Sequence, residues 1–195
     1  MTEWTQRAHV LADHAVSGVL GHVSSLHFDT MSELLWVGSA SGQLTSHTGA
    51  LPTLPRYTSL AAHGAPKQPR HVRGILSDDK FIISLSEGRV CASQRQGLGR
   101  WSMQIEDHAP GVALAGLCAS PQSASSDIIV GGAAPNSHDA LFALHSISGR
   151  IVRSAVSDGT VTQLRKGSRY LCVGTEQGTI PVSYTHLTLP TNREV

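Results

Sequence analysis

The stretch VGSASGQ at residues 37–43 decides the fold, because a close copy of it, VGTEQGT, returns at residues 173–179. Each copy follows an apolar run that contains an aromatic residue, LLW before the first copy and YLC before the second. An apolar run followed by a short glycine turn predicts a β-hairpin, in which we expect both glycines of each copy to take positive φ. The two copies therefore indicate an internal repeat of strand, tight turn and strand.

Two weaker relatives of this repeat lie between the copies. They are the apolar runs FIIS at residues 81–84 and IIV at residues 128–130, each followed by glycine. When position 37 is aligned with positions 84, 130 and 173, the steps are 47, 46 and 43 residues. A period in the forties, built from short strands and glycine turns, is typical of the four-stranded blades of a β-propeller. The predicted fold class is therefore all-β, a WD-repeat-like β-propeller with about four blades.

The pattern outside the repeat turns supports short strands and divides the chain. In the segment GHVSSLHF, Val23, Leu26 and Phe28 are expected on one sheet surface with one irregular step. The 19 glycines and 9 prolines leave almost no uninterrupted amphipathic stretch for a helix. We predict an N-terminal arm at residues 1–17, a partial propeller at residues 18–180 with blades near 18–60, 70–104, 111–156 and 159–180, and a tail at residues 181–195.

The tail drops the repeat pattern from about residue 181. Its sequence, PVSYTHLTLPTNREV, resembles translated adapter or vector read-through at the end of a truncated reading frame. We therefore expect that the native protein continues differently after this point, and that the propeller is open because the chain is truncated.

Composition excludes several classes of protein. The net charge of +1, with Lys and Arg scattered singly, lacks the clustered basic face of a nucleic-acid-binding domain. No apolar run has the length of a signal peptide core or a membrane-spanning helix, so neither secretion nor membrane insertion is expected. Cys91, Cys118 and Cys172 lie in or beside apolar runs, which favours buried, reduced thiols.

The residues suited to catalysis or metal binding do not form a convincing site. Ser137, His138 and Asp139 have the residue types of a hydrolase triad, but neighbours in one loop do not converge as a triad requires. His9 and His14 are five residues apart, without the other ligands of a zinc site. We therefore assign no catalytic, cofactor-binding or metal-binding residue. Only Arg70, His71 and Arg73, the densest basic group, are candidates for contact with an acidic partner or RNA, and a solvated blade edge is the simpler interpretation.

The longest specific signal is the continuous stretch from Val23 to His47, VSSLHFDTMSELLWVGSASGQLTSH. It resembles the amino-terminal WD-repeat region of the catalytic subunit of the poly(A)-nuclease deadenylation complex, in its fungal form. Support continues through RYTS at residues 56–59, GIL at 74–76, IISL at 82–85 and RYLCVGT at 169–175. The likeness covers roughly residues 18–180 and is thin between Pro110 and Ser157.

This resemblance implies a function for the whole protein rather than for these residues alone. Members of the family begin with a seven-bladed propeller, followed by a linker that binds a pseudokinase regulatory subunit, an inactive ubiquitin-hydrolase-like domain and a metal-dependent 3′ exoribonuclease domain. The acidic metal ligands of that last domain have no counterpart here, so no catalytic residue or cofactor carries over. The resemblance implies a cytoplasmic scaffold, with P-bodies included in that expectation, which binds the pseudokinase and engages poly(A) ribonucleoprotein indirectly.

Two other classes of function remain open from the residues. One is a WD-type adaptor of another complex, in trafficking or ubiquitin ligation. The other is an enzyme within these 195 residues, which would show ribonuclease or hydrolase activity. Whatever its function, a propeller of four blades would expose sheet edges and half-covered apolar faces. We therefore expect the chain to aggregate or to express poorly in isolation.

Overall fold

The computed structural model describes residues 22–48, 55–65, 68–108, 113–119, 127–133, 139–157, 159–167, 170–178 and 182–184. The chain forms two compact units, Met1–Met103 and Gln104–Val195. The described part is built almost entirely from short β-strands, which confirms the predicted fold class. No helix among these residues has the length and apolar character needed to cross a lipid bilayer.

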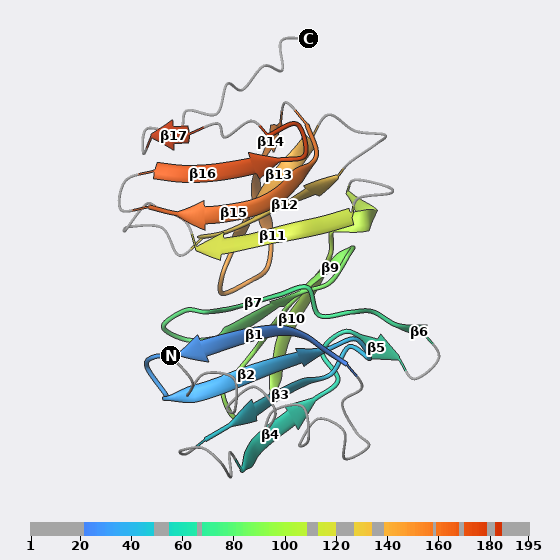
Figure 1. Ribbon diagram of the computed structural model, residues 1–195, viewed down its shortest axis with the longest axis vertical. Coiled ribbons are helices and arrows are strands. Elements are labelled where there is room, and N and C mark those ends of the chain that lie inside the picture. Colours follow the sequence, from blue (N-terminus) through green and yellow to red (C-terminus); the bar gives the residue numbers. More distant parts are fainter. Residues whose placement is uncertain are drawn as a thin grey trace, which may run out of the picture. The chain divides into compact units, whose positions relative to one another are not determined.

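The described residues of the first unit form two four-stranded sheets and a two-stranded ribbon (Figure 1). The strand orders are β1-β2-β3-β4 and β10-β9-β8-β7, so consecutive strands pair and every connection is a turn or loop. The ribbon is β5-β6. The strands are β1 (Val23–Asp29), β2 (Leu34–Ser39), β3 (Leu44–His47), β4 (Arg56–Leu60), β5 (Gly64–Ala65), β6 (Gln68–Pro69), β7 (Gly74–Ser77), β8 (Ile82–Leu85), β9 (Arg89–Ser93) and β10 (Gly99–Gln104).

The second unit repeats this plan. Its described residues hold one sheet of four strands, β11-β12-β13-β14, and one of three, β15-β16-β17, after a short 3-10 helix at Ile105–Asp107. The strand β17 falls inside the predicted tail, so regular pairing continues past residue 181, and the rest of the tail lies outside the described residues. The strands are β11 (Ala113–Ala119), β12 (Asp127–Ala133), β13 (Asp139–His145), β14 (Ile151–Val156), β15 (Val161–Lys166), β16 (Tyr170–Thr175) and β17 (Val182–Tyr184).

The two glycines of the repeat turn have different roles, which corrects the expectation that both take positive φ. Only the second does so in each copy, Gly42 with φ 81° and Gly178 with φ 76°. The first glycine lies inside the preceding strand, and at Gly38 an added Cβ would stand 2.3 Å from Ser25 Oγ and 2.6 Å from Val72 Cγ1. Gly38 is therefore required by close packing, whereas Gly42 and Gly178 are favoured by backbone conformation.

The first and last copies of the repeat contain equivalent internal hydrogen bonds. Gly42 N–H donates to Ser39 O and Gly178 N–H donates to Thr175 O, both at 3.1 Å. A register shift interrupts the start of β1 between Val23 and Ser25 and the start of β15 between Val161 and Gln163. The hydroxyl of the residue inside each shift donates to the first glycine carbonyl of the repeat at 3.2 Å, from Ser24 to Gly38 and from Thr162 to Gly174.

The shift in β1 also explains the predicted irregular step. Val23, Leu26 and Phe28 are all exposed on this strand, at 39%, 53% and 55% of their surface. The exposure is confined to β1, because Val37 and Thr45 on the same face of β2 and β3 are buried, and the main apolar cluster of this sheet lies on its other face. There Leu34, Trp36 and Leu44 pack with Val72 and Ile82, from the segment before β7 and from β8, as the core of the first unit.

The second unit has its own apolar core. It joins the four-stranded and three-stranded sheets through residues of β11, β12, β13, β15 and β16. Along β11 buried and half-buried residues alternate, as expected for a strand with two unlike faces. The buried members are Cys118, Ile129, Ala143, Val161, Leu164, Leu171 and Val173.

Candidate functional site

The predicted contact residues Arg70, His71 and Arg73 lie on the segment that leads from β6 into β7. This segment is held by Val72, which is fully buried, accepts a 2.7 Å hydrogen bond from Ser24 Oγ at its carbonyl and donates its N–H to Ser39 O at 3.1 Å. His71 and Arg73 on either side of Val72 are exposed. One buried residue therefore anchors the segment and leaves His71 and Arg73 on its surface.

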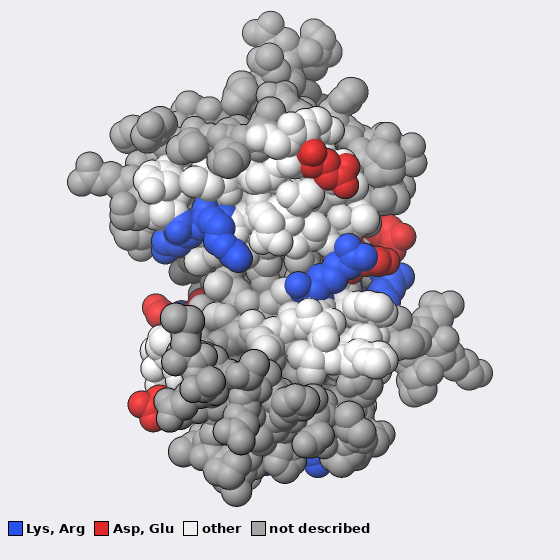
Figure 2. All heavy atoms as spheres, viewed as in Figure 1, with Lys and Arg blue, Asp and Glu red and all other residues white. Residues whose placement is uncertain are grey.

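The charge of this basic group is partly balanced. Arg73 Nη2 forms an ion pair with Glu87 Oε1, from the turn between β8 and β9, and both side chains are largely exposed. In Figure 2 the described Lys and Arg residues of each unit appear as small groups rather than as one continuous basic face. Such a surface suits a local contact with an acidic protein segment better than a track of phosphates.

A buried polar network lies next to this segment and was not predicted. His63, only 1% exposed, places Nε2 2.9 Å from Ser84 Oγ and Nδ1 3.9 Å from Cys91 Sγ. Cys91 Sγ also lies 3.2 Å from Ala62 O and 3.5 Å from Ser102 Oγ. The network joins the segment before β5 to β8, β9 and β10, so it fixes the approach of the chain to the second sheet.

The Cys91–His63 pair has the composition of a nucleophile and its base but the wrong electrostatics. Burial, reinforced by the positive charges of Arg89 and Arg70, lowers the pKa of His63 to about 4. Burial raises the pKa of the Cys91 thiol. A reactive cysteine needs a low pKa and access to substrate, whereas this thiol stays protonated beside a neutral imidazole inside the unit. The network is therefore structural.

Of the other catalytic and metal-ligand candidates considered from the sequence, the structure describes only Asp139. Ser137 and His138, like His9 and His14, lie outside the described residues, and Asp139 is the first residue of β13. Among the residues that the structure describes, no three His, Cys, Asp or Glu side chains group as metal ligands. The three cysteines are free, and Cys91 and Cys118 are buried, but Cys172 is only half-buried because it lies on the more open face of β16.

The sequence offered one weak signal for the His63 network, the pattern Ala62-His63-Gly64, which predicts a histidine beside a turn. It does not identify the partner of that histidine, because the chain has eleven histidines and many serines that could pair with one another. Only the tertiary packing of His63 against the β8–β9 pair selects Ser84 and Cys91.

Comparison with known proteins identifies relatives over nearly the whole chain. A family model described as PAN2 N-terminal matches residues 8–189, a range that extends beyond the predicted break at 181. The catalytic subunit pan2 of the PAN2-PAN3 deadenylation complex from Aspergillus oryzae is 36% identical over 158 residues, which are 80% of this chain and 12% of that protein. The corresponding subunit of Coccidioides immitis is 36% identical over 159 residues, 82% of this chain and 12% of that protein. The chain thus spans about an eighth of these relatives.

Solved structures agree with this result. The Neurospora crassa Pan2 WD40 domain matches with a TM-score of 0.71 and 27% identity, over 87% of this chain and 48% of that domain. The WD40 β-propeller domain of Doa1 matches with a TM-score of 0.64 and 14% identity, over 86% of this chain and 52% of that domain, and supports the fold alone. The WD-repeat propeller fold and the resemblance found in the sequence are both confirmed.

Proposed function

The chain belongs to the PAN2 N-terminal family, and from this membership we propose that it is a non-catalytic interaction domain of a poly(A)-shortening catalytic subunit. The family supports a place in deadenylation because its full-length relatives are catalytic subunits of the PAN2-PAN3 complex. The exonuclease chemistry, with its divalent metal, belongs in this proposal to the part of those relatives that the chain does not match. The chain itself needs no cofactor.

One observation carries the non-catalytic role. The pair most like a nucleophile and base, Cys91 and His63, is buried and held in its unreactive protonation states. Its contacts with Ala62 and Ser84 use these polar atoms for structure instead.

We assign the partner contact to the basic segment at residues 70–73, in which His71 and Arg73 are exposed and Arg70 is half-buried. The second component in the name of the relatives supports a PAN3-like pseudokinase subunit as the partner. Arg73 is already paired with Glu87, so an acidic group of the partner would compete with that carboxylate. Poly(A) ribonucleoprotein is engaged through the assembled complex in the cytoplasm, including P-bodies, rather than by a phosphate-binding face of this chain.

Binding of the chain to an immobilised PAN3-like subunit, measured by biolayer interferometry, tests the proposal. We expect the double variant R70E/R73E to bind at least about tenfold more weakly, as for a residue central to an interface. The variant K80E is the matched charge control, because Lys80 is exposed in the β7–β8 turn and should bind as the wild type does. Unchanged binding of R70E/R73E would move the contact elsewhere, and no binding by the wild type would reject this partner.

A second assay tests the catalytic assignment. The purified chain is incubated with polyadenylated RNA and divalent metal, and tail length is followed on a gel. No shortening is expected, whereas shortening that the substitution C91A abolishes would place a nuclease site at the Cys91–His63 pair.

A further inference from the structure

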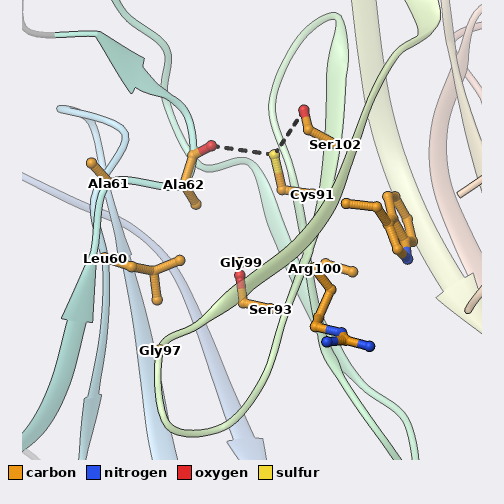
Figure 3. A pocket seen from close by; sticks show the side chains of 11 residues that line it. Leu60, Ala61, Ala62, Cys91, Ser93, Gly97, Gly99, Arg100 and Ser102 are labelled. Carbon is orange, nitrogen blue, oxygen red and sulfur yellow. Dashed lines mark hydrogen bonds between the residues drawn. The ribbon is translucent and has the colours of Figure 1, made fainter. Parts of the chain in front are cut away.

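A hollow of about 420 Å³ lies within the first unit, between β4 of the first sheet and β9 and β10 of the second (Figure 3). It lies apart from the basic segment, but Ala62, Cys91 and Ser102 of the His63 network form part of its wall. Most of its lining residues are small. They are Leu60, Ala61, Ala62, Cys91, Ala92, Ser93, Gly97, Gly99, Arg100, Trp101 and Ser102.

Contacts between the two sheets close both ends of this hollow. At one end the β9–β10 turn lies against β4, where Thr58 Oγ1 donates to Gln96 O at 3.3 Å and an added Cβ at Gly97 would stand 2.3 Å from Thr58 Oγ1. At the other end Cys91 Sγ lies 3.2 Å from Ala62 O. Figure 3 shows Leu60 and Ser93 between these two ends. The space is therefore a surface hollow, open to solvent along one side, whose two ends are held by these contacts.

The strands beside the hollow have backbone groups available for pairing. β4 and β10 each stand last in the order of their sheet, so among the described residues each has a strand on one side only. An extended peptide recognises such an edge through its main chain and places alternate side chains in adjacent pockets. The position of the hollow between two edge strands thus favours an extended polypeptide as its occupant.

The lining residues define the side chains that such a peptide needs. Alanine, glycine and the apolar Leu60 leave space for one large apolar side chain. Arg100 is the sole charged residue in the lining, and no carboxylate accompanies it there. Its guanidinium lies 5.9 Å from the centre of the Phe81 ring, a contact that leaves its N–H groups available for a carboxylate. A single cation does not suit a chain of phosphates, which disfavours nucleic acid.

We propose that this hollow binds an extended acidic segment of a partner protein, with one large apolar side chain inside it and a neighbouring carboxylate on Arg100. This site is separate from the basic segment around Arg70 and does not depend on the deadenylation function. The segment runs along the edge of β4 or β10, and Leu60 provides the apolar contact for its anchoring side chain.

The structure supplies a substitution that adds bulk at the lining without a clash. A Cβ added at Gly99 meets no atom within 4 Å, so G99W introduces a large ring at a lining position where it would compete with the peptide. R100E reverses the one lining charge. K80E, in the β7–β8 turn, is the matched charge control, and thermal unfolding of every variant checks that the fold is kept.

The probe is the fluorescein-labelled peptide Gly-Ser-Asp-Asp-Phe-Asp-Asp-Ser-Gly, titrated with the full 195-residue chain and followed by fluorescence anisotropy. We expect saturable binding that weakens at least about tenfold in G99W and in R100E and is unchanged in K80E. Replacing Phe by Ala or Asp by Lys in the peptide should weaken binding similarly.

Three results would overturn the proposal. The first is no binding to a folded wild-type chain, and the second is binding that G99W and R100E leave unchanged. The third is displacement of the peptide by oligoadenylate that itself loses affinity in G99W, which would assign the hollow to nucleic acid. If G99W unfolds, R100E and the Phe-to-Ala peptide still decide the outcome, because R100E changes an exposed side chain and the peptide change leaves the protein unaltered.

Discussion

Arg95 and Asp29, 66 residues apart in the sequence, form a buried ion pair with 2.6 Å between Arg95 Nε and Asp29 Oδ2. Asp29 ends β1 and its side chain has no exposed surface, while Arg95 lies in the β9–β10 turn and is 15% exposed. Arg95 Nη2 also donates to Asp78 O at 2.7 Å, in the β7–β8 turn. One guanidinium therefore ties together turns from both sheets of the first unit.

The first prediction concerns this pair. Replacing Asp29 or Arg95 by alanine leaves its partner as an uncompensated buried charge, so each substitution should lower the free energy of unfolding by about 3–5 kcal/mol. The ion pair Arg73–Glu87 is the matched control, because its side chains are 39% and 57% exposed and E87A should cost no more than about 1 kcal/mol. Urea unfolding followed by tryptophan fluorescence, to which the buried Trp36 contributes, measures both free-energy changes. Equal costs for D29A and E87A would contradict the stabilising role of the buried pair.

The second prediction is a loss of stability at mildly acidic pH. The unfolded state protonates His63 near the ordinary histidine pKa of 6.5, whereas the folded state does so only near pH 4. Stability should therefore be full above about pH 6.5 and fall by about 3 kcal/mol as the pH decreases to about 4, because the unfolded state binds the proton first. Burial also lowers the pKa of His27, opposed by the charge of Asp29, so His27 contributes with the same sign. The variant H63Q should lose most of this slope in urea unfolding at stepped pH values.

A third prediction uses a lower pH window. Burial alone would disfavour the charged form of Asp29, but hydrogen bonds from Arg95, Ser32 and the Met31 N–H outweigh it and lower the pKa to about 2. The stability from this carboxylate is present above about pH 4 and is lost as the pH falls toward about 2, by about 2 kcal/mol. In D29N the unfolding free energy should be lower at neutral pH and nearly constant between pH 4 and 2. A D29N curve parallel to the wild type in this window would reject Asp29 as the titrating group.

The fourth prediction separates backbone conformation from packing at three glycines. G99A should change stability little, because φ is not positive and a Cβ meets no atom within 4 Å. G178A should cost about 1 kcal/mol, since Gly178 has φ 76° but open space around it. G42A should cost more than G178A, because Gly42 has φ 81° and its Cβ would stand 2.8 Å from His63 C and 2.9 Å from Arg70 O. Thermal unfolding ranks the stabilities of the three variants. If G42A is as stable as G178A, the segment containing His63 and Arg70 must move to accommodate the added Cβ.

The fifth prediction concerns solubility. Leu26 and Phe28 are 53% and 55% exposed on β1, an edge strand of the first sheet. An exposed apolar edge promotes association between molecules, so we expect L26S/F28S to raise the aggregation onset temperature while changing the unfolding free energy by less than about 1 kcal/mol. The control L114S, at a fully buried position, should instead destabilise the fold. Static light scattering during heating measures the onset, and an unchanged onset in L26S/F28S would exclude β1 as the surface that drives association.

Much of the fold could be predicted from local pattern because each sheet is built from strands adjacent in sequence. The glycine turn at residues 37–43 and its copy gave the period, and β2 and β3 flank that turn as expected. The sequence could not show that Gly38 is required by packing and Gly42 by backbone conformation. The residue that crowds Gly38 is Val72, more than thirty residues later in the chain, and only the fold brings the two together. The candidate site shows the same division: the basic segment around Arg70 was visible, but its ion pair with Glu87 was not.

By itself the sequence determined the order of strands and turns, the repeat and the family, because these depend on neighbours along the chain and on a long continuous match. Only the tertiary structure decided which polar groups meet: His63 with Ser84 and Cys91, and Arg95 with Asp29. Those partners come from different sheets or connections, and many Ser, Asp and Arg residues share the same local pattern. Burial selects among them, because a polar group removed from water must find a partner within hydrogen-bond distance, and only the packed sheets determine which atoms lie that close.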